Sequence, residues 1–158
     1  MAQAKERSKP LGGVQLLAGT AEIRAAICDV VSRAERTLAI LTPNLEPELY
    51  EHNAFLDTVK RFVLSKSFAR IRVLIAQPDR TMMSGNQFVQ MGQRLNTYIQ
   101  FQSLASAFRP IDEAFLIGDA DAIVYRTDHS SGEGMVDRHA PEIARRYLAE
   151  FDRYWQAG

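Results

Sequence analysis

The chain has 158 residues, of which 46% are hydrophobic and 24% are charged, so its length and composition fit a globular domain with a core of its own. Lysine and arginine together number 19, as do aspartate and glutamate, and this zero net charge argues against a dedicated nucleic-acid-binding protein. The sequence has no secretory signal and no apolar run of the ~20 residues that a membrane span needs. The single cysteine, Cys28, cannot form an internal disulfide, and we expect a cytoplasmic protein with no membrane span.

The predicted elements alternate between helices and strands along most of the chain. Residues 1–13 are polar and end in two glycines, which predicts a flexible arm before a single domain at 14–158. Thr20 is the predicted N-cap of the first helix. Apolar periodicity and turn residues predict helices at 20–34, from 46 to about 63, at 88–95 and at 141–155, strands at 37–41, 71–76, 99–102, 115–117 and 123–125, and a mobile loop at 127–134.

This order is α-β-α-β-α-β-β-β-α, and it predicts an α/β fold. Strands separated by helices favour parallel pairs covered by helices on both faces of a sheet. The strands at 115–117 and 123–125 are joined by the short turn Gly118-Asp119-Ala120-Asp121, which is typical of an antiparallel hairpin. We therefore expect one mixed sheet with helices on both faces.

The segment from 111 to 125 also carries a pattern of polar residues. Asp112, Ala114 and Asp119 hold the three places that a histidine, a lysine two places later and an aspartate five places after the lysine hold in the phospholipase D signature. The chain resembles one half of a phospholipase D-like fold in this segment, in the Thr42–Pro47 loop and in the Phe151–Trp155 ending. It is also similar to an uncharacterised bacterial domain that is found alone or behind acetyltransferase domains.

The resemblance implies a histidine that attacks phosphorus and a lysine that holds the phosphate oxygens. Asp112 would repel a phosphodiester and Ala114 carries no charge, so only Asp119 matches the pattern. We predict no catalytic residue, no cofactor and no metal, and we interpret the chain as a catalytically inactive binding or scaffold module. Single halves of the superfamily pair across a two-fold axis, so the resemblance also implies a homodimer, and the bacterial domain implies an acetyltransferase partner.

A ligand site is predicted at the carboxyl ends of the first two strands, where open α/β sheets bind their ligands. Its candidate residues are Asn44, Glu46, Arg80, Asp112 and Asp119, and its expected ligand is a small anionic or phosphorylated molecule. The alternative for Asn44 and Glu46 is that they only cap the helix that follows them.

Other interpretations of the acidic residues stay open. A hydrolase or phosphodiesterase with a non-standard acidic site would use Asp112, Glu113 or His129 as its acid or base, and an oligomerisation or regulatory domain for acyltransferases would need none of them. Asp121 adds to the acidic set around 112–121, although such turns are more typical of hairpins than of metal sites.

Overall fold

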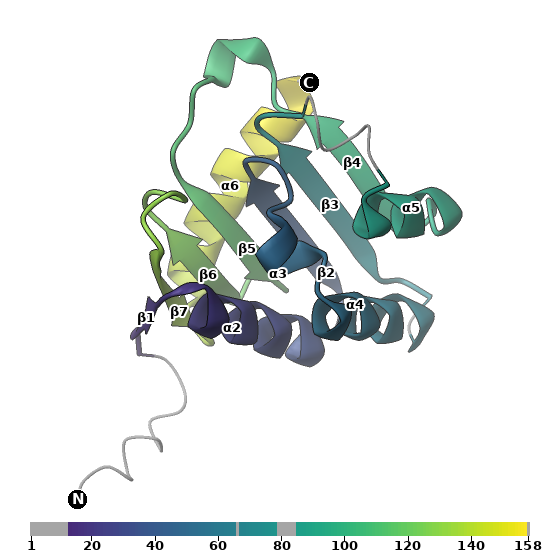
Figure 1. Ribbon diagram of the computed structural model, residues 1–158, viewed down its shortest axis with the longest axis horizontal. Coiled ribbons are helices and arrows are strands. Elements are labelled where there is room, and N and C mark those ends of the chain that lie inside the picture. The colour runs from purple at the N-terminus through teal and green to yellow at the C-terminus, as the bar shows by residue number, and fades with distance from the viewer. Residues whose placement is uncertain (1–12, 66, 79–84, 158) are drawn as a thin grey trace, which may run out of the picture.

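The computed structural model describes residues 13–65, 67–78 and 85–157, so the predicted arm at 1–13 lies outside the described residues except for Gly13. Strands and helices follow one another along the chain much as the sequence predicts (Figure 1). In chain order they are β1 (Gln15–Ala18), α2 (Thr20–Arg33), β2 (Thr37–Thr42), α3 (Pro47–Tyr50), α4 (Asn53–Ser65), β3 (Arg70–Ile75), α5 (Gln87–Arg94), β4 (Ile99–Ser103), the short 3₁₀ helix Ser106–Phe108, β5 (Ala114–Gly118), β6 (Ala122–Arg126), β7 (Glu133–Asp137) and α6 (Pro141–Ala157).

The strands form one seven-stranded sheet in the order β1-β7-β6-β5-β2-β3-β4. β2, β3 and β4 run parallel, and each is joined to the next through a helix, as a parallel crossover requires. β2 pairs antiparallel with β5 on its other side, where Leu41 lies opposite Phe115, and the pairs β5–β6, β6–β7 and β7–β1 are antiparallel too. The α/β class and the mixed sheet are therefore confirmed.

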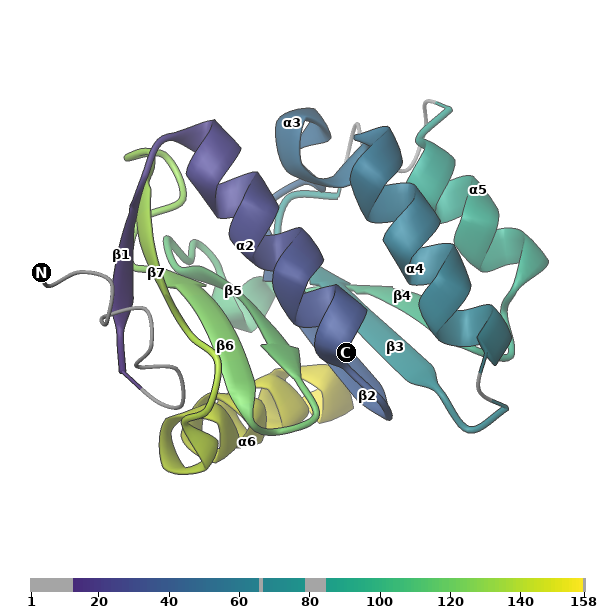
Figure 2. The same ribbon diagram turned by 90° about the horizontal axis from the view of Figure 1, so that it is seen from below.

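Helices cover both faces of this sheet. α2, α4 and α5 lie on one face and α6 lies on the other (Figure 2). The sheet residues divide accordingly, because alternate side chains of a strand point to opposite faces. Leu116 and Val124 belong to the core beneath α2 and α4, while Phe115 and Ile117 belong to the core beneath α6.

The start of α2 differs from the prediction. Its buried residues are spaced at three and four positions, from Ile23 through Ile27 to Val31, as the sequence indicates. The N-cap, however, is Gly19 with φ 88°, and Thr20 is the first helical residue. A glycine is favoured there because other residues avoid positive φ. The prediction of Thr20 as a side-chain cap was wrong.

Two strands were missed at one side of the sheet. β1 has only four residues, and β7 begins at Glu133, inside the stretch predicted as a loop. They pair with each other, with Leu17 opposite Gly134. Short strands with one exposed face lack the apolar run that identified β2 and β3, so tertiary pairing determines both of them.

The helix predicted from 46 is two helices. α3 ends at Tyr50, and α4 begins at Asn53 after a break at Glu51 and His52. Both helices bury apolar side chains, Leu49 and Tyr50 in α3 and the predicted face around Phe55 and Val59 in α4. Within the described residues, no helix has both the length and the apolar character needed to cross a bilayer.

Candidate functional site

The turn after β2 positions the first candidate residues. Thr42 is fully buried, and its Oγ1 accepts a hydrogen bond from the Leu45 N–H at 3.0 Å. Leu45 has φ 56° and is fully buried, so the turn points this side chain into the core and directs Glu46 along the sheet edge. A positive φ at a branched apolar residue is unfavourable, and it persists only where packing compensates for it.

Glu46 forms a two-point ion pair with Arg126, the last residue of β6. Arg126 Nη1 donates to Glu46 Oε2 at 2.7 Å and Nη2 donates to Oε1 at 2.8 Å. The side chain of Arg126 is 5% exposed and that of Glu46 is 17% exposed, so both charges are largely withdrawn from water. Glu46 stands at the N-cap position of α3 but makes no side-chain capping hydrogen bond, because both of its carboxylate oxygens accept from one guanidinium.

Tyr50 of α3 completes this buried polar cluster, which we call the Glu46–Arg126–Tyr50 cluster. Burial raises the pKa of the fully buried Tyr50, although the neighbouring Arg126 charge opposes the rise. Burial by itself would lower the pKa of Arg126, but the hydrogen bonds to Glu46 and the nearby Tyr50 and Glu46 groups together outweigh it, and the pKa of Arg126 is raised. Arg126 thus carries a firmly held positive charge that Glu46 neutralises in place.

Ala114 lies directly across the β5–β6 ladder from Arg126. Opposite residues of an antiparallel pair point to the same face, with Cβ atoms about 4.5–5.5 Å apart. Leu116 and Val124, two places further along each strand, lie in the core beneath α2, so Ala114 and Arg126 face that helix layer too. The place at which the resemblance implies a lysine therefore adjoins a guanidinium that already has a carboxylate partner.

Asp112 lies at the same edge as Glu46. Since Leu41 is opposite Phe115, the end of β2 and the start of β5 meet there, and Asn44 and Asp112 are both exposed. The Asp112 carbonyl accepts a hydrogen bond from the His129 N–H at 2.9 Å. The fold thus brings Asn44, Glu46 and Asp112 to one edge of the sheet, along with the main chain of His129.

Asp119 lies at the opposite end of β5 from Asp112, roughly 20 Å away along an extended strand. Its Oδ1 accepts hydrogen bonds from the N–H groups of Arg36 and Thr37 at 2.7 and 3.0 Å, and its Oδ2 accepts one from Glu35 at 2.8 Å. Asp119 therefore fixes the connection between α2 and β2. The structure separates it from the other candidate ligand residues, and we remove it from that set.

The same residue also forms the predicted hairpin turn. Asp119 and Ala120 have φ 57° and 55°, and the Asp121 N–H donates to the Gly118 carbonyl at 3.0 Å. Two successive positive φ values are those of a type I′ turn, here within the three-residue loop 119–121 that joins β5 to β6. The Asp121 carboxylate pairs with His139 Nδ1 at 2.9 Å. Among the residues that the structure describes, no three His, Cys, Asp or Glu side chains are grouped as metal ligands.

Glu113 faces the α6 side of the sheet. Its Oε1 accepts a hydrogen bond from the Tyr125 hydroxyl at 2.7 Å, and Tyr125 packs against Tyr147 of α6 with ring centroids 4.8 Å apart. Burial and these neighbours raise the pKa of Tyr125. A hydrolase that used Glu113 as its acid or base would have to release this carboxylate from the Tyr125 hydroxyl.

Arg80, the remaining candidate, lies outside the described residues. The residues that sequence reasoning missed are Arg126 and Tyr50. The available signal was the sequence Ala122–Arg126, in which an arginine closes an otherwise apolar strand. Its partner could not be identified, because Glu46 is 80 residues away along the chain.

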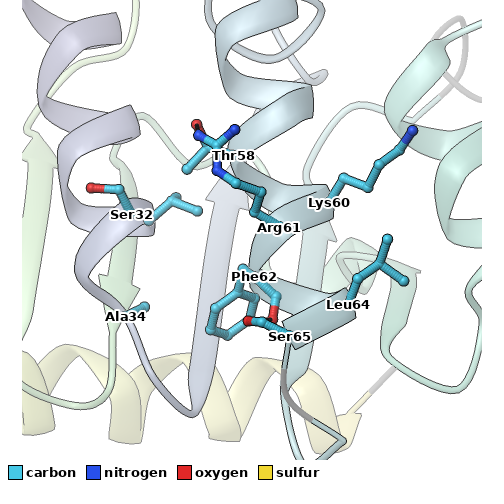
Figure 3. A pocket seen from close by; sticks show the side chains of 9 residues that line it. Ser32, Ala34, Thr58, Lys60, Arg61, Phe62, Leu64 and Ser65 are labelled. Atoms are coloured by element: carbon cyan, nitrogen blue, oxygen red, sulfur yellow. Dashed lines mark hydrogen bonds between the residues drawn. The ribbon is translucent and has the colours of Figure 1, made fainter.

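A separate groove of about 510 Å³ lies between the C-terminal halves of α2 and α4 (Figure 3). Ser32 and Ala34 line it from the α2 side, and Thr58 and Arg61 line it from α4. It lies toward the starts of β2 and β3, which is the sheet edge opposite to the Glu46–Arg126–Tyr50 cluster. Of the predicted site residues that the structure describes, none lines it.

Comparison with known families gives one match over most of the chain. The model of a family described as "Domain of unknown function (DUF7931)" matches residues 19–158. Comparison with curated proteins gives no match.

Solved structures with a similar fold belong to several kinds of protein. Nuc from Salmonella typhimurium, a phospholipase D family member, superposes with a TM-score of 0.65 at 14% identity, over 92% of this chain and 95% of that one. TrmBL2, an archaeal chromatin protein with a novel mode of DNA binding, gives 0.68 at 11% identity, over 91% of this chain and 51% of its own. Phosphatidylserine synthase from Haemophilus influenzae Rd KW20 gives 0.65 at 15%, over 96% and 40%. The fold is therefore phospholipase D-like, and the chain spans about half or less of the last two proteins.

Proposed function

We propose that this chain, which belongs to the DUF7931 family and has a phospholipase D-like fold, is a binding or scaffold module without phosphodiesterase activity. The observation that carries the proposal is the Glu46–Arg126 pair beside Ala114. This ion pair supports the absence of phosphodiesterase activity, because a charge that is already neutralised lies where the resemblance implies a free cation.

Arg126 is a poor substitute for the missing lysine. A catalytic cation must be free to stabilise the charge that develops on the phosphate oxygens. Arg126 is almost fully buried and gives two hydrogen bonds to Glu46, so it would have to break a buried ion pair before it could bind a phosphate. Breaking such a pair costs about 3–5 kcal/mol, which disfavours any ligand that requires it.

The nucleophile is missing as well. Asp112 is an exposed carboxylate at the place of the histidine, and its negative charge disfavours the approach of a phosphodiester. The non-standard acidic hydrolase is the less favoured alternative, because the Glu113 carboxylate already accepts a hydrogen bond from the Tyr125 hydroxyl. A phosphorylated ligand at this edge would depend on cations other than Arg126, of which Arg80 is the candidate that the sequence provides.

A homodimer and an acetyltransferase partner remain part of this proposal. The chain matches Nuc over nearly the full length of both proteins but covers only 40% of the phosphatidylserine synthase, which supports a unit the size of one phospholipase D-like half. A closed two-fold pair of such units would bring two candidate edges together. Sedimentation equilibrium tests the homodimer, and a protein that is monomeric at all concentrations would exclude it.

The ligand part of the proposal is tested by thermal shift with inorganic phosphate, nucleotides, coenzyme A and short oligonucleotides. A ligand at about 100 times its Kd stabilises a protein by about 2.7 kcal/mol, which raises Tm by several degrees. We expect a phosphorylated ligand to give such a shift, and we expect Arg80→Ala to abolish it while Lys60→Ala does not. Equal shifts in the two variants would place the binding elsewhere.

A further inference from the structure

Strand β4 is the last strand of the sheet, and no other strand of the described residues pairs with its outer edge. β3 pairs with it on one side only, from Ile71↔Ile99 to Ile75↔Ser103. The flanking hydrogen bonds, Ile71 N–H to the Tyr98 carbonyl and Leu104 N–H to the Ile75 carbonyl, show that the even-numbered residues of this strand face β3. In a parallel pair the alternate residues face away, so the main-chain groups of Ile99, Phe101 and Ser103 point outward.

These outward groups are largely unused. Ile99 donates its N–H to the Leu95 carbonyl at 3.0 Å. Within the described part of the chain, no hydrogen bond uses the Ile99 carbonyl or the N–H and carbonyl groups of Phe101 and Ser103. An exposed strand edge of this kind is a template for another strand, and proteins usually protect it with charges, proline or a bulge. The sequence from Ile99 to Ser103, Ile-Gln-Phe-Gln-Ser, contains none of these protections.

A groove of about 730 Å³ follows this edge. α5 forms one wall on one side of the sheet and Trp155 of α6 contributes from the other side, consistent with the positions of α5 and α6 in Figure 2. α5 approaches β4 closely at Gly92, where an added Cβ would lie 2.2 Å from the Phe101 ring. The volume is within the range of about 300–1,000 Å³ that is typical of ligand sites.

The chemistry of the groove selects its occupant. Of the residues that the structure describes, nine line the groove, none of them carries a charge, and four are carboxamides: Gln93, Asn96, Gln100 and Gln102. The Gln102 Oε1 atom is buried and has no hydrogen-bond partner in the described structure. An unsatisfied buried acceptor destabilises the structure, and an N–H group of a bound peptide would satisfy it. An uncharged lining disfavours phosphate and nucleic acid, whereas alternating donors and acceptors fit a peptide backbone.

We propose that the β4 edge binds an extended peptide segment of a partner protein, which adds to the sheet as an eighth strand. Successive side chains of the bound strand would point to opposite faces of the sheet, so the two faces set which side chains are preferred. Its residues on the α5 side would meet Val89 and Phe101 and favour apolar side chains, and those on the α6 side would meet Gln100 and Gln102 and favour uncharged polar ones. The inference is independent of the proposed function, because it concerns a different edge of the sheet and no phosphodiester.

The test is selection of a phage-displayed library of random nine-residue peptides on the full chain. Ser103→Pro removes an outward N–H, and proline is tolerated on an edge strand at such a position. Ser103→Ala is the matched control, because Ser103 is exposed and the alanine keeps the N–H. We expect selected peptides to alternate apolar and uncharged polar residues, to bind wild type and Ser103→Ala equally, and to bind Ser103→Pro at least about tenfold more weakly.

Hydrogen exchange gives a readout that needs no variant. Addition of a selected peptide should slow exchange of the Phe101 and Ser103 amides, and Gln102→Leu should weaken peptides that carry a polar residue opposite it. The proposal is overturned if no peptide is enriched, or if enriched peptides bind Ser103→Pro as well as wild type. A wild-type dimer that becomes monomeric in Ser103→Pro would identify a second copy as the occupant and would also overturn it.

Discussion

At the residue scale, the acidic side chains that the sequence grouped together have different roles in the structure. Glu46 neutralises a buried guanidinium, Asp119 binds three backbone N–H groups, and Glu113 binds a tyrosine hydroxyl on the other face. The sequence identified the residues but not their faces or partners, because these depend on contacts between segments about 80 residues apart. Their positions at strand ends could be predicted, and their roles could not.

The Glu46–Arg126 pair should be essential for stability. Glu46→Ala leaves a buried guanidinium without its partner, and we expect the free energy of unfolding to fall by about 3–5 kcal/mol. Urea denaturation measures it, with the exposed Glu48→Ala of the same helix start as the control. The double variant Glu46→Leu/Arg126→Met should recover most of the loss, because it removes both charges at once. A single variant as stable as wild type would show that the pair contributes little.

Asp119 should contribute to the stability of the fold and not to ligand binding. Asp119→Ala removes the acceptor of three N–H bonds, each about 1.5–3 kcal/mol when the acceptor is charged, but partial exposure reduces the sum. We expect a loss of about 2–4 kcal/mol by chemical denaturation and a smaller loss for Asp119→Asn, which keeps one acceptor oxygen and tolerates the positive φ. If Asp119→Ala abolished a phosphate-induced thermal shift without changing Tm, Asp119 would return to the ligand set.

At the element scale, long amphipathic helices and apolar strands were predictable, and short paired strands were not. α2, α4 and α6 show the apolar periodicity that marks a buried face, and β2 and β3 are apolar runs. β1 and β7 form because each satisfies the hydrogen-bonding edge of the other, which no local pattern records. The break between α3 and α4 was not predicted either. Tyr50, the last residue of α3, belongs to the Glu46–Arg126–Tyr50 cluster, and no local sequence pattern records that contact.

The packing of α5 on β4 depends on a glycine. A Cβ at position 92 would lie 2.2 Å from the Phe101 ring, so Gly92→Ala forces the helix and the strand apart. We expect Gly92→Ala to lower the unfolding free energy by about 1–3 kcal/mol, as overpacked cores do. The exposed Gln93→Ala controls for helix propensity, and Phe101→Leu in the Gly92→Ala background should restore part of the loss. No change in Tm would contradict this close contact.

The ion pair between Asp29 of α2 and Arg138, which precedes α6, should make the stability of the fold depend on pH. Partial burial works to raise the pKa of Asp29, but the hydrogen bonds and the positive charges of Arg138 and Arg33 together outweigh it and lower that pKa. A lowered pKa in the folded state adds stability above the ordinary value of about 3.9, and this stability is lost as the pH falls through the folded pKa.

Asp29→Asn should therefore be less stable than wild type at pH 6, and the difference should shrink as the pH falls below about 4. Urea titrations at pH 6, 4 and 3 measure the difference. Asp57→Asn, on the exposed surface of α4, is the matched control for the loss of a carboxylate. A difference that is constant with pH would show that ionisation of Asp29 is not its cause.

At the scale of the whole molecule, the mixed sheet with helices on both faces followed from the order of elements, and the solved structures share it. The candidate site was predictable only as an edge of that sheet, because the parallel strands end there. Its character was not predictable, because the Glu46–Arg126 pair joins a loop after β2 to the end of β6. In our proposal this edge corresponds to the place of a phosphodiesterase site, and the Glu46–Arg126 ion pair occupies part of it.

The most direct test of this account is a phosphodiesterase assay of the full chain with bis(p-nitrophenyl) phosphate and with single-stranded DNA. We predict no turnover above the uncatalysed rate, and the same result for Asp112→Ala, because neither Asp112 nor Ala114 supplies the nucleophile or the free cation. Turnover by the unaltered protein that is lost in a folded Asp112→Ala variant would contradict the account and establish an acidic active site at this edge.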